Sequence, residues 1–174
     1  MMKNLTTKIL FLLFITSSCS DGVRVEGYID RSGENLKMAQ AWIDNLLIND
    51  LDAVRDLMHE DFSFMYMGLT ENEDGVYGKG GISYNKDAFF SDYWPVVGEL
   101  LPNGISLKTT EVIAGRNGVA LVQEGDAEGI NGEYDNKYVW IFQIRERLIY
   151  SVREYNSDLL VGTRLYKNKL VEEK

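Results

Sequence analysis

The sequence predicts a single α+β domain in which three N-terminal helices pack on a strongly curved antiparallel or mixed sheet, leaving a cone with an open mouth. Apolar residues recur at helical spacing up to about Trp94, whereas residues 105–155 alternate as long strands joined by short turns. These strands exceed the usual length of about five or six residues, so we expect the sheet to coil strongly. A chain of 174 residues, 45% of them hydrophobic, can bury one core.

The first two helices follow each other directly. The first is predicted to begin at Gly33 with Ser32 as its cap, and Asn49-Asp50 ends it. Asp50 caps the second helix, which is predicted to close near His59. The apolar face of the first helix is formed by Leu36, Ala39, Ile43, Leu46 and Leu47.

A strand and a third helix come next. Residues 62–67 are apolar or aromatic at nearly every position and predict a strand covered on both faces, and the polar, glycine-rich residues 71–79 predict a loop. Asn85 can cap a third helix over residues 86–94, which Pro95 is expected to end or bend.

The remaining sequence predicts a sheet of four strands and a C-terminal segment. Asn131-Gly132 is a strong signal for a two-residue hairpin turn. Residues 158–166 are expected to pack back on the domain. The four strands are predicted over residues 105–114, 119–129, 133–145 and 148–155.

Charge and composition exclude several partners. The net charge is −9 and no run of lysine or arginine exceeds two residues, so we expect no nucleic-acid partner. One cysteine and one histidine exclude a zinc site of the Cys/His type. We expect no metal and no cofactor.

The N-terminus has the layout of an export signal. Lys3 and Lys8 precede an apolar run at residues 9–15, and small residues lead to Cys19, the sole cysteine. This segment resembles a bacterial lipoprotein signal, which implies cleavage after residue 18 and acylation of Cys19. The chain would then be secreted across the inner membrane and held in the bacterial cell envelope by its acyl chains alone, with residues 19–31 as a tether. An ordinary cleaved signal with an incidental cysteine, or an uncleaved segment, is the alternative.

Several stretches of the domain resemble one superfamily in their order and spacing. Residues 38–54 and 59–62 resemble the opening helices and the acidic junction of nuclear-transport-factor-2-like domains. Residues 132–138, which read G-x-Y-x-N-x-Y, and residues 149–155, which read I-x-x-x-R-E-Y, resemble the last two strands of the SnoaL-like branch. The resemblance covers about residues 33–160 and implies a cone with an apolar pocket and a capacity to form a homodimer. We expect the domain to span residues 32–166, followed by a polar tail at 167–174. Its members include enzymes and binding modules, so the fold does not settle the function.

The resemblance also argues against one activity. Ketosteroid isomerases need a carboxylate at the end of the first strand, where residues 64–68 have none, and Trp42 stands where their tyrosine is expected. The acid of their penultimate strand falls near residues 139–140. The sole histidine, His59, is predicted at a helix C-terminus, as a capping or surface residue.

Glu154 is the best candidate for a catalytic acid or base. If its side chain points inward, burial would raise its pKa and suit it to act as a general base. If it points outward, it would pair with Arg153 or Arg145 on the surface of the sheet. Large apolar groups lie on both faces of this strand, so the alternation leaves the two orientations open.

The candidate ligand-binding residues lie on four predicted elements. Our leading hypothesis is a domain that binds a small apolar or aromatic molecule by stacking and a few hydrogen bonds. The first alternative is a cofactor-free cyclase, isomerase or hydrolase that uses Glu154, and the second is a noncatalytic dimerisation or assembly module whose aromatic side chains fill the cone. The candidates are Trp42, Tyr66, Asn136, Tyr138, Trp140 and Tyr155.

Overall fold

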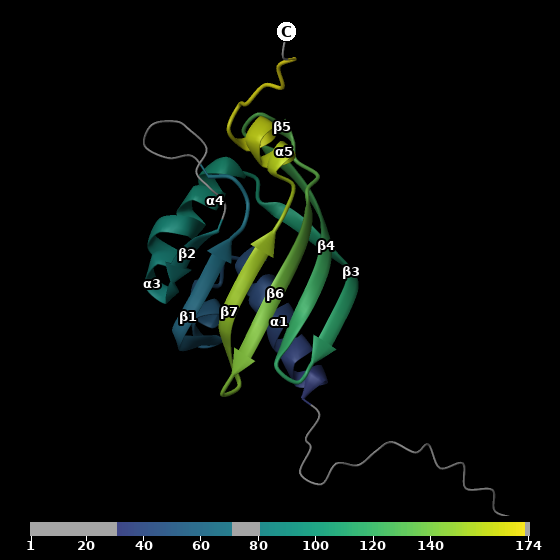
Figure 1. Cartoon of the computed structure of the whole chain (residues 1–174). Coiled ribbons are helices and arrows are strands. Elements are labelled where there is room, and N and C mark those ends of the chain that lie inside the picture. Colours follow the sequence, from purple (N-terminus) through teal and green to yellow (C-terminus); the bar gives the residue numbers. More distant parts are fainter. Residues whose placement is uncertain (1–30, 71–80, 173–174) are drawn as a thin grey trace, which may run out of the picture.

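The computed structural model describes residues 31–70 and 81–172. Helices pack on one side of a curled seven-stranded sheet with the strand order β2-β1-β7-β6-β4-β3, and β5 pairs with β4 (Figure 1). This architecture confirms the predicted α+β class. Cys19, the predicted signal segment, the tether up to residue 30 and the loop predicted at residues 71–79 lie outside the described residues. None of the described helices is long and apolar enough to span a membrane.

Helix α1 (Ser32–Leu47) crosses the inner side of the sheet and supplies much of the core. It begins one residue earlier than predicted, because Arg31 and not Ser32 occupies the N-cap position, and no side chain caps it. The Nδ2 atom of Asn35 donates to the carbonyl oxygens of Gly115 and Arg116, at 2.9 and 3.0 Å, so it ties the helix to the turn after β3 (Ile105–Gly115).

Helix α2 (Leu51–Asp56) is capped as predicted, since the Asp50 carboxylate accepts from the backbone N–H of Ala53 at 3.1 Å. It ends at Asp56, before His59, and β1 (Met58–Tyr66) begins two residues later. The predicted position of His59 at a helix C-terminus is therefore wrong. The cause is a long-range pairing, because β1 runs parallel to β7 (Leu148–Tyr155) and this contact draws the preceding residues into the sheet.

The third helix is longer than predicted and changes its winding midway. The segments α3 (Lys86–Ala88), η1 (Phe89–Tyr93) and α4 (Trp94–Leu100) follow one another without a break, and η1 is π-helical. Pro95 does not end this run, and it lies in the first turn of α4, directly after the π-helical turn at which the winding changes.

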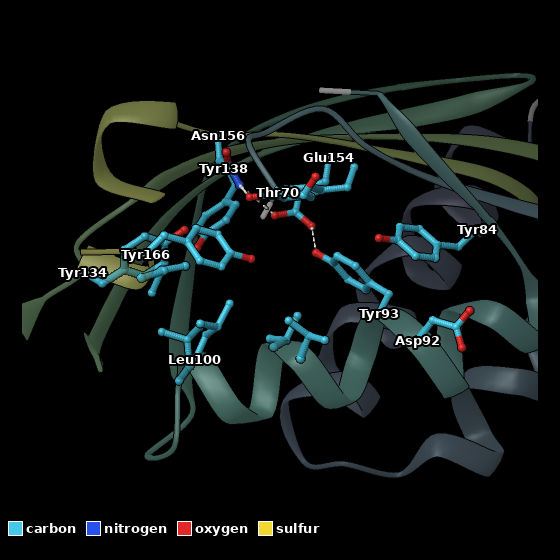
Figure 2. A pocket seen from close by; sticks show the side chains of 15 residues that line it. Thr70, Tyr84, Asp92, Tyr93, Leu100, Tyr134, Tyr138, Glu154, Asn156 and Tyr166 are labelled. Atoms are coloured by element: carbon cyan, nitrogen blue, oxygen red, sulfur yellow. Dashed lines mark hydrogen bonds between the residues drawn. The ribbon is translucent and has the colours of Figure 1, made fainter. Parts of the chain in front are cut away.

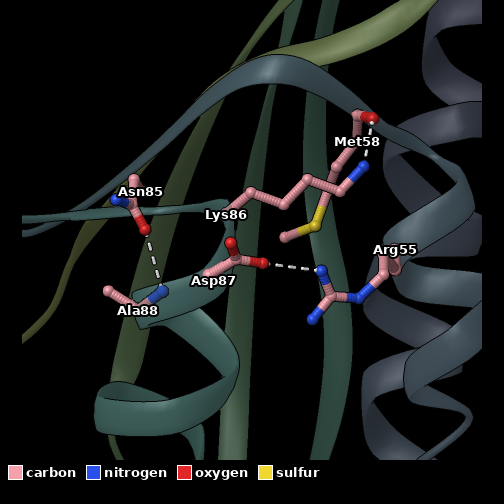
Figure 3. A network of polar contacts seen from close by, with 6 residues as sticks. All are labelled: Arg55, Met58, Asn85, Lys86, Asp87 and Ala88. Atoms are coloured by element: carbon pink, nitrogen blue, oxygen red, sulfur yellow. Dashed lines mark hydrogen bonds and ion pairs between the residues drawn. The ribbon is translucent and has the colours of Figure 1, made fainter.

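Polar contacts fix the start of this helical run to its neighbours (Figure 3). Asn85 caps α3 as predicted, since its Oδ1 atom accepts from a backbone N–H three residues later at 2.9 Å. The Lys86 ammonium donates to the Met58 carbonyl oxygen at 2.9 Å, and Arg55 pairs with Asp87 at 2.9 Å. The helical run that carries Tyr93 is thus attached to α2, to β1 and, through the short unpredicted strand β2 (Ile82–Asn85), to the edge of the sheet.

The long strands match the prediction at three of four places. β3, β4 (Gly118–Gly129) and β7 lie where expected, but the strand predicted over residues 133–145 is divided into β5 (Gly132–Glu133) and β6 (Lys137–Arg145). The interruption coincides with Asn136, whose Oδ1 atom accepts from the backbone N–H groups of Lys137 and Ser157 at 2.8 and 3.0 Å. Because Gly129 pairs with Gly132, the two-residue turn consists of residues 130–131, one position earlier than predicted.

The C-terminal segment packs against one end of the sheet. It contains α5 (Asp158–Leu160) and π-helical η2 (Val161–Leu165), which lie beside β5 in Figure 1. Val161 and Leu165 are buried, and Asn131 binds the carbonyl oxygens of Arg164 and Leu165. This segment forms one wall of the cavity described below.

Candidate functional site

A cavity of about 300 Å³ lies between the η1–α4 helical run, the inner face of the sheet and the C-terminal segment (Figure 2). None of the described residues that line it is lysine, arginine or histidine. Six of the lining residues are tyrosines, namely Tyr66, Tyr84, Tyr93, Tyr134, Tyr138 and Tyr166. Most of the lining residues other than these tyrosines are aliphatic.

Glu154 points into this cavity. On β7 the inward positions are Val152 and Glu154, which are 0% and 4% exposed, and the outward position Tyr155 is 37% exposed. Glu154 lies between Tyr66 on β1 and Trp140 on β6 in the register of the sheet. The orientation that the sequence left open is therefore inward.

Two side chains hold the Glu154 carboxyl group, one at each oxygen. The Tyr93 hydroxyl donates to Oε2 at 2.8 Å, and the Asn156 Nδ2 atom donates to Oε1 at 3.1 Å (Figure 2). Nδ2 of Asn156 also donates to the Tyr66 hydroxyl at 3.3 Å. The carboxyl group is thus oriented by a helix on one side and by the end of β7 on the other.

Burial determines the acidity of this site. Burial raises the pKa of Glu154 from 4.5 to about 7, against the lowering effect of the hydrogen bonds from Tyr93 and Asn156. Burial also raises the pKa of the Tyr93, Tyr66 and Tyr138 hydroxyls well above their usual range. Near neutral pH these phenols are protonated donors, whereas the Glu154 carboxyl group can exchange a proton.

Of the predicted ligand-binding residues, Tyr66 and Tyr138 line the cavity together with Glu154. Trp42 and Trp140 instead line a second cavity of about 60 Å³. Glu154 lines both cavities, as do Tyr93 and Tyr138. The structure therefore brings five of the seven predicted catalytic and binding residues to two adjoining spaces.

Asn136 and Tyr155 do not line either cavity. Asn136 is fully buried, and its amide binds the Tyr134 hydroxyl at 2.8 Å in addition to the backbone of the C-terminal segment. Its side-chain hydrogen bonds are made within the protein, so the structure does not place Asn136 in either cavity. The alternation along β7 turns the Tyr155 side chain outward. For these two residues a ligand contact stays a prediction.

His59 is also remote from the cavity. Its Nδ1 atom accepts from the backbone N–H of Asp61 at 3.0 Å, and its Nε2 atom lies 3.8 Å from a Glu146 carboxylate oxygen. The ring packs edge-on against Tyr150, with 5.5 Å between the ring centroids. These contacts give His59 a structural role, in agreement with its sequence assignment as a noncatalytic residue.

Sequence reasoning did not assign Tyr93 and Asn156 to the site. Tyr93 lies inside the predicted helix over residues 86–94, but the π-helical winding that sets the direction of its side chain has no signature in the sequence. Asn156 had a usable signal, because it lies two residues after Glu154 and therefore shares its face of an extended chain.

Comparison of the sequence with protein-family models and with curated proteins gives no match. The structure, however, is similar to many solved structures. An NTF2-like protein from Burkholderia xenovorans aligns at a TM-score of 0.61 and 16% identity, covering 77% of this chain and 97% of that chain. IdmH, a proposed polyketide cyclase from Streptomyces antibioticus, aligns at 0.61 and 12%, covering 76% and 98%. TerC, co-crystallised with polyporic acid, aligns at 0.61 and 18%, covering 77% and 98%.

Identities this low show the fold alone. The chain therefore has the cone fold of nuclear-transport-factor-2-like proteins, as the sequence resemblance implied.

Proposed function

We propose that this domain transfers protons on a small, mostly apolar aromatic or polycyclic substrate, with Glu154 as general base and general acid and without a cofactor. The observation that carries this proposal is the buried Glu154 carboxyl group, with its pKa raised to about 7, on the wall of a cavity of about 300 Å³. A desolvated carboxyl group inside a ligand-sized space is the feature expected of an enzyme and not of a filled structural cone.

The hydrogen bonds of Glu154 leave it free to act on a ligand. A carboxylate offers about four lone-pair positions, and Tyr93 and Asn156 occupy one at each oxygen. A remaining position can accept a substrate proton while the two donors hold the group in place. Positioning of this kind reduces the entropic cost of the reaction.

The pKa of Glu154 fits both directions of a proton transfer. With a pKa of about 7, the ionised and the neutral carboxyl groups are both well populated near neutral pH. The ionised form can remove a proton from the substrate, and the neutral form can return it at another atom. General acid–base catalysis is most effective when the pKa lies near the working pH.

The lining of the cavity indicates the class of substrate. Tyr66, Tyr93 and Tyr138 present ring faces for stacking and hydroxyl groups for orientation, and about 300 Å³ is at the small end of ligand pockets. The names of two structural neighbours support an aromatic substrate, since one is a proposed polyketide cyclase and the other was crystallised with polyporic acid. Together with the strand motifs at residues 132–138 and 149–155, they also support our proposal of a SnoaL-like domain.

A second candidate function is ligand binding without turnover. It is favoured by the low exposure of Glu154, 4%, and by the hydrogen bonds that already bind both of its oxygens. On that hypothesis the Glu154 carboxyl group only holds the neighbouring side chains in place by hydrogen bonds, and Tyr138 and Tyr66 provide the ligand contacts. The hypothesis of an assembly module is weaker, because the aromatic side chains leave the cavity open.

The experiment that separates these functions measures proton transfer directly. 1-Tetralone, a bicyclic aryl ketone, exchanges the hydrogens next to its carbonyl for deuterium in D₂O when a base removes them. If Glu154 is a general base, the protein should accelerate this exchange and Glu154→Gln should abolish the acceleration. A binding protein would bind the ketone and leave its exchange rate unchanged.

We also propose that the chain is exported and anchored at Cys19 in the bacterial envelope, with residues 19–31 as a tether before α1. The support is the order of positive residues, apolar run and lone cysteine. A homodimer, implied by the sequence resemblance, is a further proposal that sedimentation of the soluble domain would test.

A further inference from the structure

Buried polar atoms without a protein partner gather around the two cavities. In residues 31–70 and 81–172, five buried side-chain nitrogen or oxygen atoms lack a hydrogen-bond partner. Four of them belong to residues that line one of the cavities: the Nε1 atoms of Trp42 and Trp140, Oγ1 of Thr70 and Oδ1 of Asn156. Buried polar groups are normally satisfied, so such a concentration points to a missing polar partner.

Both unpartnered indole N–H groups belong to residues of the second cavity. Trp42 and Trp140 line it, their rings lie 6.2 Å apart between centroids in an edge-to-face arrangement, and Trp140 is adjacent to Glu154 in the sheet register. The volume of about 60 Å³ accommodates a small group such as a carbonyl. The cavity adjoins the larger one, since Tyr93 and Glu154 line both.

The third tryptophan, Trp94, provides a comparison, because its indole N–H has a hydrogen-bond partner. Trp94 also lines the second cavity, but its Nε1 atom donates to Oδ1 of Asn49 at 3.1 Å. Trp42 and Trp140 are therefore distinguished by their unused N–H groups and not by residue type or location.

We infer that the indole N–H groups of Trp42 and Trp140 bind a carbonyl oxygen of the substrate in the second cavity. This inference rests on the proposed function and narrows the substrate class to cyclic or aromatic ketones. An indole N–H is a donor only, so its partner must be an acceptor. An anionic acceptor is disfavoured, because Glu154 is negative when ionised and none of the described lining residues is a cation.

The position of Glu154 gives this carbonyl a chemical role. A ketone with its oxygen in the second cavity places the neighbouring C–H bonds at the boundary that Glu154 lines. The Glu154 carboxylate takes one proton, the electron pair of the C–H bond forms a carbon–carbon double bond, and the carbonyl π electrons move to oxygen. The two indole N–H groups would stabilise the resulting enolate oxygen, as donors aimed at developing charge do in other enzymes.

The test compares 1-tetralone with tetralin, the same bicycle without the oxygen, on the ¹⁵N-labelled protein. The three tryptophans are expected to give separate indole N–H signals, which Trp94→Phe and Trp140→Phe assign. We expect 1-tetralone, but not tetralin, to move the Trp42 and Trp140 signals downfield, as hydrogen bonding does. The Trp94 signal is the internal control, because its N–H is already bound. A shift of one of the two signals alone would support the site and identify its donor.

Affinity provides a second measurement. In the native protein 1-tetralone should bind about 10-fold more tightly than tetralin, because it satisfies buried donors. Trp140→Phe keeps an aromatic ring and should reduce this preference toward unity. Because the signal shifts are measured on the native chain, a variant that fails to fold does not remove the test.

The outcomes separate this inference from the proposed function. If deuterium exchange depends on Glu154 but neither indole signal responds specifically to the ketone, the carbonyl site is wrong and the proposed function stands. If the indole signals respond but no exchange occurs, the carbonyl site stands and catalysis is wrong. Failure of both bicycles to perturb any residue of the cavities would contradict both.

Discussion

The Tyr93 hydroxyl donates a hydrogen bond to Oε2 of Glu154 at 2.8 Å, joining a π-helical turn to the inner face of the sheet. The two residues are far apart in the sequence, and their contact lies on the wall of the main cavity. The Tyr93 ring is held by Phe64 and Phe89, with centroid distances of 4.5 and 5.5 Å, so the position of its hydroxyl is set by core packing.

Tyr93→Phe should raise the pKa of Glu154 above about 7, because the Tyr93 hydroxyl stabilises the ionised carboxylate. The phenylalanine ring can keep the packing on Phe64 and Phe89. Titration of the ¹³C-labelled glutamate carboxyl group by NMR measures the change, and Tyr84→Phe is a matched control because it removes a hydroxyl from the same cavity. An unchanged or lower pKa in Tyr93→Phe would show that the hydrogen bond does not control this acid.

Glu154→Gln should change how stability depends on pH. The pKa of Glu154 is raised from 4.5 to about 7 in the folded protein, so between these values the folded chain holds a proton that the unfolded chain has lost. Stability should therefore decline as pH rises from about 4.5 to about 7, and this contribution is fully lost above that range. Glutamine does not ionise and loses no such proton. At pH 8 the free energy of unfolding of the variant should therefore rise relative to that of the native protein by up to about 3 kcal/mol.

Urea unfolding at pH 5 and pH 8 measures this difference. Glu111→Gln, on the exposed face of β3, is the control for loss of a carboxylate at a solvent-exposed position. If Glu154→Gln and the native protein respond equally to pH, Glu154 does not carry the shifted proton.

Gly68→Ala should displace the side chains that hold the Glu154 carboxyl group in place. A Cβ atom at Gly68 would lie 2.6 Å from the Tyr66 hydroxyl oxygen and 2.7 Å from Oδ1 of Asn156, closer than real contacts allow. Relief of this overlap must move one of these side chains, so we expect a loss of about 1–3 kcal/mol and slower proton transfer. Gly98→Ala is the control, because nothing lies within 4 Å of its added Cβ atom and alanine favours the α4 helix by about 0.5–1 kcal/mol. Equal stability of Gly68→Ala and the native protein would contradict the tight packing.

Cys19→Ser should release the protein from the membrane into the soluble envelope fraction, because the acyl chains would supply the whole of its membrane affinity. Fractionation and intact-mass measurement check this result, with Ser20→Ala as the control beside the cysteine. Membrane attachment of Cys19→Ser, or an unmodified thiol in the native protein, would contradict anchoring.

Local signals in the sequence predict most of the fold. The caps Asp50 and Asn85 are properties of short segments, and they appear as expected. The predicted apolar face of α1 is buried at Ala39, Ile43 and Leu46, but Leu47 is 37% exposed and Trp42 is buried in its place. The errors arise where distant segments decide. His59 enters β1 because that strand pairs with β7, and the strand predicted from residue 133 is interrupted where Asn136 binds the backbone at Ser157.

The candidate site is less predictable for the same reason. The sequence singles out Glu154 as the candidate acid, but the orientation of its side chain depends on which face of β7 the helices cover. Tyr93 could not be paired with it from the sequence, because the pair forms only when the helical run from residue 86 to 100 crosses the open side of the sheet.

The rate of deuterium exchange next to the carbonyl of 1-tetralone, with native protein and with Glu154→Gln at pH 8, tests the central claim most directly. If Glu154 is the general base, the native protein should accelerate exchange and the rate should rise with pH to a plateau above about 7. The folded Glu154→Gln protein should then lose about 10²–10⁴-fold of that acceleration while still binding the ketone. Equal exchange rates in the two proteins, with 1-tetralone bound to both, would contradict the account and leave the domain as a binding module.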